Sequence, residues 1–269
     1  MESRSVIDLA ILGAVRQEVE ALLAILKSPR SVILLGQPAQ VGSFRGWSLL
    51  IGATGLGKVN GAITAAALLE RFSVRRMWNV GCAGAYAGGP LGIGDVLIAR
   101  ETIIGDEGVL TRNTVLPLKT IGIPLALRNG REYYDSIPCE GMKEDLPPGR
   151  YRLKGDLALP IEEGEATTGD SFRLAYGPSL TVGMASGDPE TASERFDRHG
   201  AYAESMEGSG IALACLRGNV PFMECRGMSN VAGERRKDRW DFGRAFGNCH
   251  GVVLRLLEEL TKTEKPSEI

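Results

Sequence analysis

Apolar runs with the lengths of buried strands alternate along this chain with stretches of helical apolar spacing. Strand-like runs lie at residues 6–12, 47–53, 77–82, 95–104, 180–185 and 220–227. Amphipathic helical spacing occupies residues 17–26, 58–72 and 242–260. Such alternation is typical of α/β proteins, whose helices cover both faces of a mostly parallel or mixed sheet. It predicts a three-layer α/β/α domain with a twisted central sheet and a ligand crevice beyond the carboxyl ends of its strands.

A single domain is expected over residues 1–260, because no linker rich in proline, glycine or serine divides the 269 residues. Residues 116–165 fit the alternation poorly and contain six prolines, at positions 117, 124, 138, 147, 148 and 160. We interpret this segment as an irregular surface excursion with short strands. Residues 261–269 are polar, and we expect them to form a frayed tail.

The composition argues against several classes of function. The formal net charge is −2 without a basic block, so a nucleic-acid partner or a membrane surface has no electrostatic support. No apolar run is long enough to span a bilayer. Five cysteines without C-x-x-C spacing and only two histidines predict reduced thiols in a cytoplasmic protein, with neither a disulfide framework nor a metal site.

The segment Gly52-Ala-Thr-Gly-Leu-Gly57-Lys58 satisfies the G-x-x-x-x-G-K pattern of nucleotide-binding loops. It lies between a predicted strand and a predicted helix, so a P-loop NTPase is one alternative. The next residue is Val59, whereas that motif needs a Ser or Thr hydroxyl to hold Mg²⁺. We therefore favour a glycine-rich turn whose backbone amides face an anion or a polar ligand.

Three further segments carry groups suited to a nucleoside. A second glycine-rich turn, at residues 79–86, follows a strand and lets a ligand lie close to the backbone. Met206-Glu207 opens an apolar helix, and a buried strand then ends in Ser229-Asn230. A carboxylate suits a sugar hydroxyl and an amide suits a purine edge, so these segments predict a nucleoside pocket.

Ordered blocks between about residues 7 and 257 resemble the superfamily of nucleoside phosphorylases and nucleosidases. The blocks are Gly13-Ala14 with Glu18-Val19, residues 55–60, residues 79–84, Gly94-Asp95-Val96, residues 169–172, Met206-Glu207-Gly208 and residues 226–230. Residues 106–108 together with Arg235 and Trp240 are most similar to the hydrolases of the alternative menaquinone pathway. The resemblance implies a homodimer without metal or organic cofactor, in which a partner residue can close each pocket.

The resemblance assigns roles to two glutamates in the cleavage of a purine N-glycosidic bond. Glu18 would be the base that activates the attacking water, although its neighbours alone would suit a solvated surface residue. Glu207 would accept hydrogen bonds from ribose hydroxyls as positive charge develops at C1′, or alternatively would only interact with a helix N-terminus. Phosphate ligands are lacking before Glu18 apart from Arg16, so hydrolysis is favoured over phosphorolysis.

Asn230 stands where similar adenine-releasing nucleosidases have an aspartate. An amide cannot protonate N7 of the leaving purine and can only donate a hydrogen bond to it. This shifts the expected preference toward a 6-oxopurine such as hypoxanthine. It does not strictly exclude adenine, whose N6 and N7 edge an asparagine can also bind.

Further substrate contacts are expected around these three residues. Ser229 adjoins Asn230. The floor of the pocket would be formed by Cys82, Ala83 and Gly84. Met206 would pack against the ribose, and Phe172 would stack on the base. Ordinary core packing is the alternative for the methionine and the phenylalanine.

The substrate of the hydrolases of the alternative menaquinone pathway carries a benzoate on the 5′ side of its ribose. The resemblance therefore implies a cationic side chain that binds this carboxylate. Arg173, Arg235 and Arg236 are candidates for this contact. Four alternatives stay open: an adenine-releasing nucleosidase, a purine nucleoside phosphorylase, a P-loop NTPase and a non-catalytic nucleoside-binding module.

Overall fold

The computed structural model describes residues 4–112, 114–140, 146–162, 165 and 171–266. Within this part, twelve strands form one mixed sheet: β2 (Leu9–Gly13), β3 (Lys27–Leu34), β4 (Gln37–Phe44), β5 (Trp47–Ala53), β7 (Met77–Ala85), β8 (Val96–Ile104), β13 (Ser136–Pro138), β14 (Gly149–Lys154), β15 (Leu157–Pro160), β16 (Ser171–Thr181), β17 (Ala203–Ser205) and β18 (Phe222–Val231). Their order is β15-β14-β16-β8-β18-β7-β2-β5-β4-β3, while β13 pairs with β8 and β17 pairs with both β16 and β7. Two-stranded sheets join β1 (Val6–Ile7) to β6 (Ser73–Val74), β9 (Val109–Leu110) to β10 (Val115–Leu116) and β11 (Ala126–Arg128) to β12 (Arg131–Tyr133).

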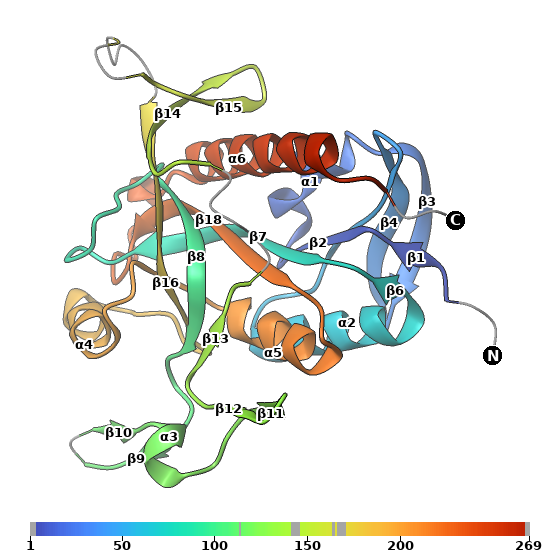
Figure 1. The fold of residues 1–269 in the computed structure, drawn as a ribbon. Coiled ribbons are helices and arrows are strands. Elements are labelled where there is room, and N and C mark those ends of the chain that lie inside the picture. The colour runs from blue at the N-terminus through green and yellow to red at the C-terminus, as the bar shows by residue number, and fades with distance from the viewer. Residues whose placement is uncertain (1–3, 113, 141–145, 163–164, 166–170, 267–269) are drawn as a thin grey trace.

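Helices cover both faces of the large sheet (Figure 1). The long helix α6 (Phe242–Thr263) lies along one face near the short α1 (Glu20–Leu23), whereas α2 (Lys58–Arg71) and α5 (Gly208–Gly218) lie side by side on the other. The remaining helical segments are η1 (Arg16–Glu18), α3 (Leu118–Ile121), α4 (Pro189–His199) and η2 (Lys237–Arg239). This arrangement confirms the predicted three-layer α/β/α architecture.

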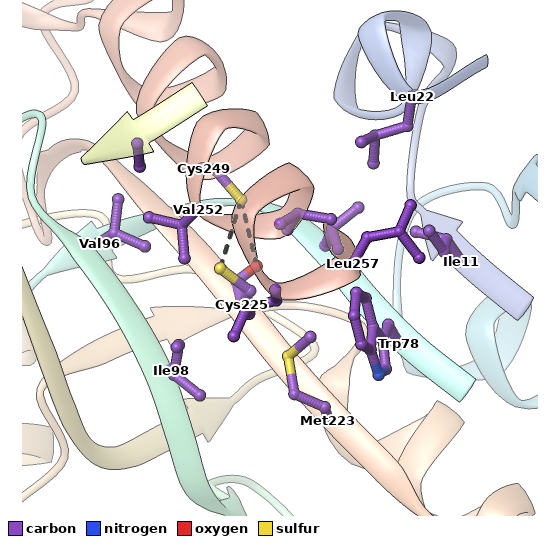
Figure 2. Packing of buried hydrophobic residues seen from close by; sticks show 14 of the residues in the cluster. Ile11, Leu22, Trp78, Val96, Ile98, Met223, Cys225, Cys249, Val252 and Leu257 are labelled. Atoms are coloured by element: carbon purple, nitrogen blue, oxygen red, sulfur yellow. Dashed lines mark hydrogen bonds between the residues drawn. The ribbon is translucent and has the colours of Figure 1, made fainter. Parts of the chain in front are cut away.

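The apolar stripe of α6 forms the core on its side of the sheet. Asp241 caps the helix by accepting a 2.9 Å hydrogen bond from the backbone N–H of Arg244. One turn apart along the stripe, Cys249 and Val252 face the sheet, where they meet residues of β8 and β18 such as Cys225 (Figure 2). Burial of such apolar surface stabilises the fold by about 25 cal/mol per Å².

The predicted polar tail begins later than expected. Helix α6 continues through Thr263, so residues 261–263 belong to it, and residues 267–269 lie outside the described part. Among the residues described, no helix combines the length and the apolar character needed to cross a bilayer.

The structure differs from the prediction at two elements. Instead of a helix over residues 17–26, the chain forms η1, then the single turn α1, and enters β3 at Lys27. The helix is interrupted at Val19, whose φ and ψ are −124° and 0°, because the preceding Glu18 turns its carboxylate back onto the backbone N–H of Ala14. The predicted strand at residues 180–185 also ends early, since β16 stops at Thr181.

The segment 116–165 is only partly a surface excursion. Its strand β13 pairs with β8, and β14 pairs with β16, so both extend the central sheet. Elements β9, β10 and α3 project from one end of the molecule (Figure 1), whereas β11 packs against α5 and strand β15 of the β14–β15 hairpin packs against α6. The prolines interrupt the alternating pattern without removing the segment from the sheet.

The centre of the sheet gathers several strand ends at one edge. Strand β2 runs parallel to β5 and β7, and β7 runs parallel to β18, so all four end on the same side. In such sheets the ligand crevice lies beyond the carboxyl ends of the strands. The first glycine-rich turn follows the end of β5, whereas residues 79–85, which were predicted to form a second turn, belong to the extended strand β7.

Candidate active site

A cavity of about 370 Å³ opens at this edge of the sheet. It is lined by all three predicted catalytic residues and by five predicted contact residues: Glu18, Glu207, Asn230, Cys82, Ala83, Gly84, Met206 and Ser229. A larger hollow of about 640 Å³ lies beside α4 but is lined by neither Glu18 nor Glu207, so the predicted site residues meet in the smaller cavity. The structure therefore brings together side chains that are far apart along the chain.

Glu18 is buried at the end of η1 with its carboxylate held by three backbone donors. Its Oε2 accepts hydrogen bonds from Ala14 N at 2.6 Å and Val15 N at 3.2 Å, and its Oε1 accepts one from Cys82 N at 2.9 Å. A Cβ on Gly81 would lie 2.3 Å from Oε1, so only glycine allows this approach. The backbone thus fixes the orientation of the carboxylate and does not leave it as a solvated surface group.

Cys82 lies beside this carboxylate without being a reactive thiol. Burial, followed by the charge of Glu18, raises the pKa of its thiol to about 12. The neutral thiol can shape the cavity floor, as predicted, but it cannot serve as a thiolate nucleophile at neutral pH.

Glu207 immediately precedes α5, yet its side chain does not cap that helix. Its Oε1 accepts a 3.0 Å hydrogen bond from the backbone N–H of Gly57, and its Oε2 lies 3.6 Å from Nη2 of Arg226. Burial raises the pKa of Glu207, while Arg226 and the Gly57 N–H act in the opposite direction. These contacts disfavour the alternative of a glutamate that only interacts with its own helix terminus.

The geometry of the first glycine-rich turn disfavours the P-loop interpretation. The amide of Gly57 is directed at a carboxylate of the protein itself, so this turn already faces an anion. The ammonium of Lys58 pairs with Asp106 and Glu107, instead of projecting freely toward a phosphate site. Val59, at the position of the required hydroxyl, is exposed.

A buried arginine pairs with Glu207 and with Glu224, and the sequence interpretation gave it no role. Arg226 is fully buried in β18, where its Nε donates a 2.8 Å hydrogen bond to Oε1 of Glu224. Burial alone would lower its pKa, but the carboxylates of Glu224, Glu207 and Glu18 together raise it. The sequence does contain a signal for this network, because Glu224 and Arg226 are charged residues at alternate positions of a buried strand.

Asn230, the penultimate residue of β18, has its amide held in one orientation. Its Oδ1 accepts a 2.8 Å hydrogen bond from Ser229 Oγ, and its Nδ2 donates one of the same length to the carbonyl of Val231. An amide nitrogen carries two hydrogens, so one N–H remains available to a ligand. Ser229 therefore orients the amide.

Three aromatic rings form a wall of the cavity that the sequence interpretation missed. Trp240 and Phe242 meet edge to face with centroids 5.4 Å apart, and Phe246 stacks 5.7 Å from Phe242. The guanidinium of Arg235 lies over Trp240 at 5.0 Å and also lines the cavity. The spacing of Phe242 and Phe246, four residues apart at the start of α6, could have predicted that both rings lie on one face of the helix. Next along the stack, His250 donates a 2.7 Å hydrogen bond from Nε2 to the carbonyl of Glu18.

The structure corrects the placement of two predicted contact residues. Phe172 is buried against Tyr151 in the main core, with ring centroids 6.0 Å apart, and does not reach the cavity. Arg173 bonds the carbonyl of Pro90 through Nη1 and lines a separate hollow. Alternation along β16 directs one of these side chains into the core and the other outward. Gly169 and Asp170 of the same block lie outside the described residues.

A mixed sheet whose strand ends surround a cavity with two buried carboxylates and an amide defines an enzyme site for a small polar ligand. The family model of the phosphorylase superfamily matches residues 8–262, and the chain belongs to this superfamily.

Curated relatives and solved structures agree with this assignment. Futalosine hydrolase of Thermus thermophilus is 34% identical over 213 residues, which cover 79% of this chain and 83% of that protein. The 5'-methylthioadenosine/S-adenosylhomocysteine nucleosidase of Mycobacterium tuberculosis is 28% identical over 262 residues, 95% and 98% of the two chains. The corresponding nucleosidase of Neisseria meningitidis, solved with methylthio-immucillin-A, shares the fold with a TM-score of 0.71 and 21% identity, covering 94% of this chain and 99% of its own. These relatives are nucleosidases, in agreement with the predicted class of N-glycosyl hydrolase.

Proposed function

We propose that this protein hydrolyses the N-glycosidic bond of futalosine, releasing hypoxanthine and dehypoxanthine futalosine in the alternative menaquinone pathway. The observation that carries the proposal is the convergence of Glu18, Glu207 and Asn230 on one cavity. The relative at 34% identity bears the name futalosine hydrolase.

Glu18 has the geometry of a general base for water. Its three backbone donors hold the carboxylate at the cavity wall, where it can accept a proton from a water that attacks C1′. As the bond to the purine breaks, the base leaves with the electron pair and takes up a proton from solvent. The amide of Asn230 stabilises the departing base through its remaining N–H.

Glu207 supplies the complementary charge on the ribose. Cleavage passes through a ribosyl cation-like transition state, in which a carboxylate on a ribose hydroxyl becomes more stabilising than in the bound substrate. Its hydrogen bond from Gly57 orients the group, and the distance of 3.6 Å to Arg226 leaves it free to accept a hydroxyl.

Hydrolysis is favoured over phosphorolysis by the position of Arg16. This arginine pairs with Glu20 at 3.5 Å, and its side chain is 71% exposed. It lines a different hollow from the two glutamates. The predicted phosphate-binding alternative therefore lacks its cation.

The aromatic wall and Arg235 favour a nucleoside with an aromatic carboxylate on its 5′ side. Trp240, Phe242 and Phe246 offer flat apolar surface, and Arg235 adds a cation at the outer end of the same wall. The second candidate substrate is methylthioadenosine, because relatives that act on it match nearly the whole chain and an apolar wall would also suit a methylthio group.

Chromatography of the released base tests the proposal. The purified protein is incubated with futalosine, its 6-amino analogue and methylthioadenosine, with and without phosphate. We expect hypoxanthine from futalosine at a rate independent of phosphate, and no product from the Glu18→Gln control. If the protein releases adenine from methylthioadenosine but no base from futalosine, methylthioadenosine replaces futalosine as the proposed substrate.

The homodimer implied by the resemblance is part of this proposal. Leu56, Val59 and Ile63 form an exposed apolar strip on and beside α2, and Leu56 also lines the cavity. A second copy on this strip would cover the cavity mouth. Light scattering after size exclusion is expected to give twice the chain mass of 28.8 kDa.

A further inference from the structure

We propose that Glu204 is a specificity-determining residue that recognises the N1–H of a 6-oxopurine and, with Asn230, selects this class of leaving base over aminopurines. The inference rests on the proposed function and names a recognition group that the sequence interpretation did not include.

The sheet register places Glu204 and Asn230 on either side of one glycine. Gly84 of β7 is the pairing partner of Glu204 on β17 and also of Asn230 on β18. Directly opposed residues of neighbouring strands project on the same face of a sheet. Gly84 has no side chain between them, and all three line the cavity. The result is a flat floor with a carboxylate on one side and an amide on the other.

Glu204 is held as an ordered acceptor. Its Oε2 accepts hydrogen bonds from Tyr86 at 3.0 Å, from Ser186 Oγ at 2.7 Å and from Arg195 at 3.2 Å. Its Oε1 accepts a 2.8 Å bond from Ser186 N. A carboxylate oxygen has about two acceptor positions, so Oε1 retains one for a ligand while Oε2 is saturated.

The two purine classes differ in the group that faces such an acceptor. A 6-oxopurine carries a hydrogen on N1 and an acceptor at O6, whereas N1 of adenine is itself an acceptor. A carboxylate therefore accepts a hydrogen bond from hypoxanthine but faces the N1 lone pair of adenine. Rejection by an unpaired buried polar group is among the strongest forms of discrimination available to a pocket.

Sequence patterns alone did not indicate this cluster. Helix α4, which supplies Arg195, begins at Pro189 behind the capping Asp188 and ends at Gly200, both recognisable signals. Glu204 itself lies on a three-residue strand just before the Met206-Glu207 pair. Only the pairing of β17 with β7 brings it beside Gly84.

Equilibrium binding of free bases tests the inference without relying on turnover. Hypoxanthine, 1-methylhypoxanthine and adenine are titrated into the wild type, Glu204→Gln and the matched control Tyr86→Phe. The control removes one donor to the saturated Oε2 and leaves Oε1 unchanged. We expect the wild type to bind hypoxanthine about 10- to 100-fold more tightly than the other two bases.

Glu204→Gln should reduce the preference for hypoxanthine over adenine at least tenfold, because it removes the negative charge that faces the N1 lone pair of adenine and weakens the acceptor for N1–H of hypoxanthine. Tyr86→Phe should keep the preference within about threefold, since a neutral hydrogen bond contributes little net energy. Equal weakening of all three bases by Glu204→Gln, or equal affinities in the wild type, would overturn the inference. If Glu204→Gln does not fold, the relative affinities of the wild type for hypoxanthine, 1-methylhypoxanthine and adenine still test the inference.

The two levels of proposal fail differently. Failure of the proposed function appears as absence of hypoxanthine from futalosine with the wild type. Failure of the present inference appears as unchanged base selectivity in Glu204→Gln while the wild type still releases hypoxanthine.

Discussion

The backbone N–H of Gly57 donates a 3.0 Å hydrogen bond to the carboxylate of Glu207, 150 residues further along the chain. This contact requires the N-terminal ends of α2 and α5 to approach closely. Gly210 permits it, because a Cβ at that position would lie 2.2 Å from the carbonyl oxygen of Lys58. A turn that resembles a phosphate-binding loop thus orients a carboxylate of the protein.

Replacing Glu18 by Gln should lower kcat about 10²- to 10⁴-fold, because an amide cannot take a proton from water. The side chain keeps its shape, so the affinity for free hypoxanthine should change little. Single-turnover kinetics and base titration check both parts. Unaltered turnover would remove Glu18 from the role of base.

The pH profile of kcat should reveal the raised pKa of Glu207. In the proposed mechanism the ionised form accepts the ribose hydroxyl, so we expect activity to fall as the pH drops through this pKa, which burial places above the ordinary glutamate value of about 4.3. The raised pKa also stabilises the folded state most at pH values below the ordinary one, and this contribution is lost as the pH rises through the raised value. Profiles from pH 4 to 8 are compared with Glu207→Gln. A limb at or below 4.3, or one retained in the variant, would contradict the role.

Asn230→Asp should raise activity on adenine nucleosides relative to futalosine, because a carboxyl group can protonate N7 whereas the amide cannot. The ratio of kcat/KM values for futalosine and its 6-amino analogue measures the change. We expect this ratio to shift at least tenfold toward the amino substrate. Uniform inactivation on both substrates would refute the argument about the leaving group.

Arg235→Ala should raise KM for futalosine about tenfold, because the guanidinium over Trp240 is the cation at the aromatic wall. Methylthioadenosine, which lacks a carboxylate, should be turned over with an unchanged KM wherever activity on it is measurable. Arg236→Ala is the matched control, since Arg236 pairs with Asp238 at 3.0 Å instead. Equal effects of the two variants would exclude a specific contact from Arg235.

Arg226→Met should destabilise the fold by about 3–5 kcal/mol, because it leaves Glu224 and Glu207 buried without their cation. Guanidinium unfolding monitored by tryptophan fluorescence measures the loss. Arg236→Met, at an exposed position, should stay within about 0.5 kcal/mol of the wild type. Adding Glu224→Gln should restore part of the stability. A loss below 1 kcal/mol would show that the arginine contributes little to the buried network.

Local patterns along the chain were enough to predict the layers of the fold and the approximate positions of the site residues. Apolar spacing located β5, α2 and α6 within a few residues, because these elements bury one continuous face or stripe. The glycine-rich turn after β5 and the Met206-Glu207 pair were recognisable because their chemistry is local, whereas the second predicted turn proved to be part of β7. The resemblance also predicts that Glu18, Glu207 and Asn230 share one site.

Which side chains face the cavity depends on how distant segments pack together. The resemblance places Phe172 at the base, with core packing as the alternative, and the structure shows the core packing, on Tyr151. The pairing of Glu204 with Gly84, and the burial of Arg226 beside two glutamates, depend on strand register between distant segments. Register is set by the packing of the whole sheet, and no local pattern in the chain specifies it.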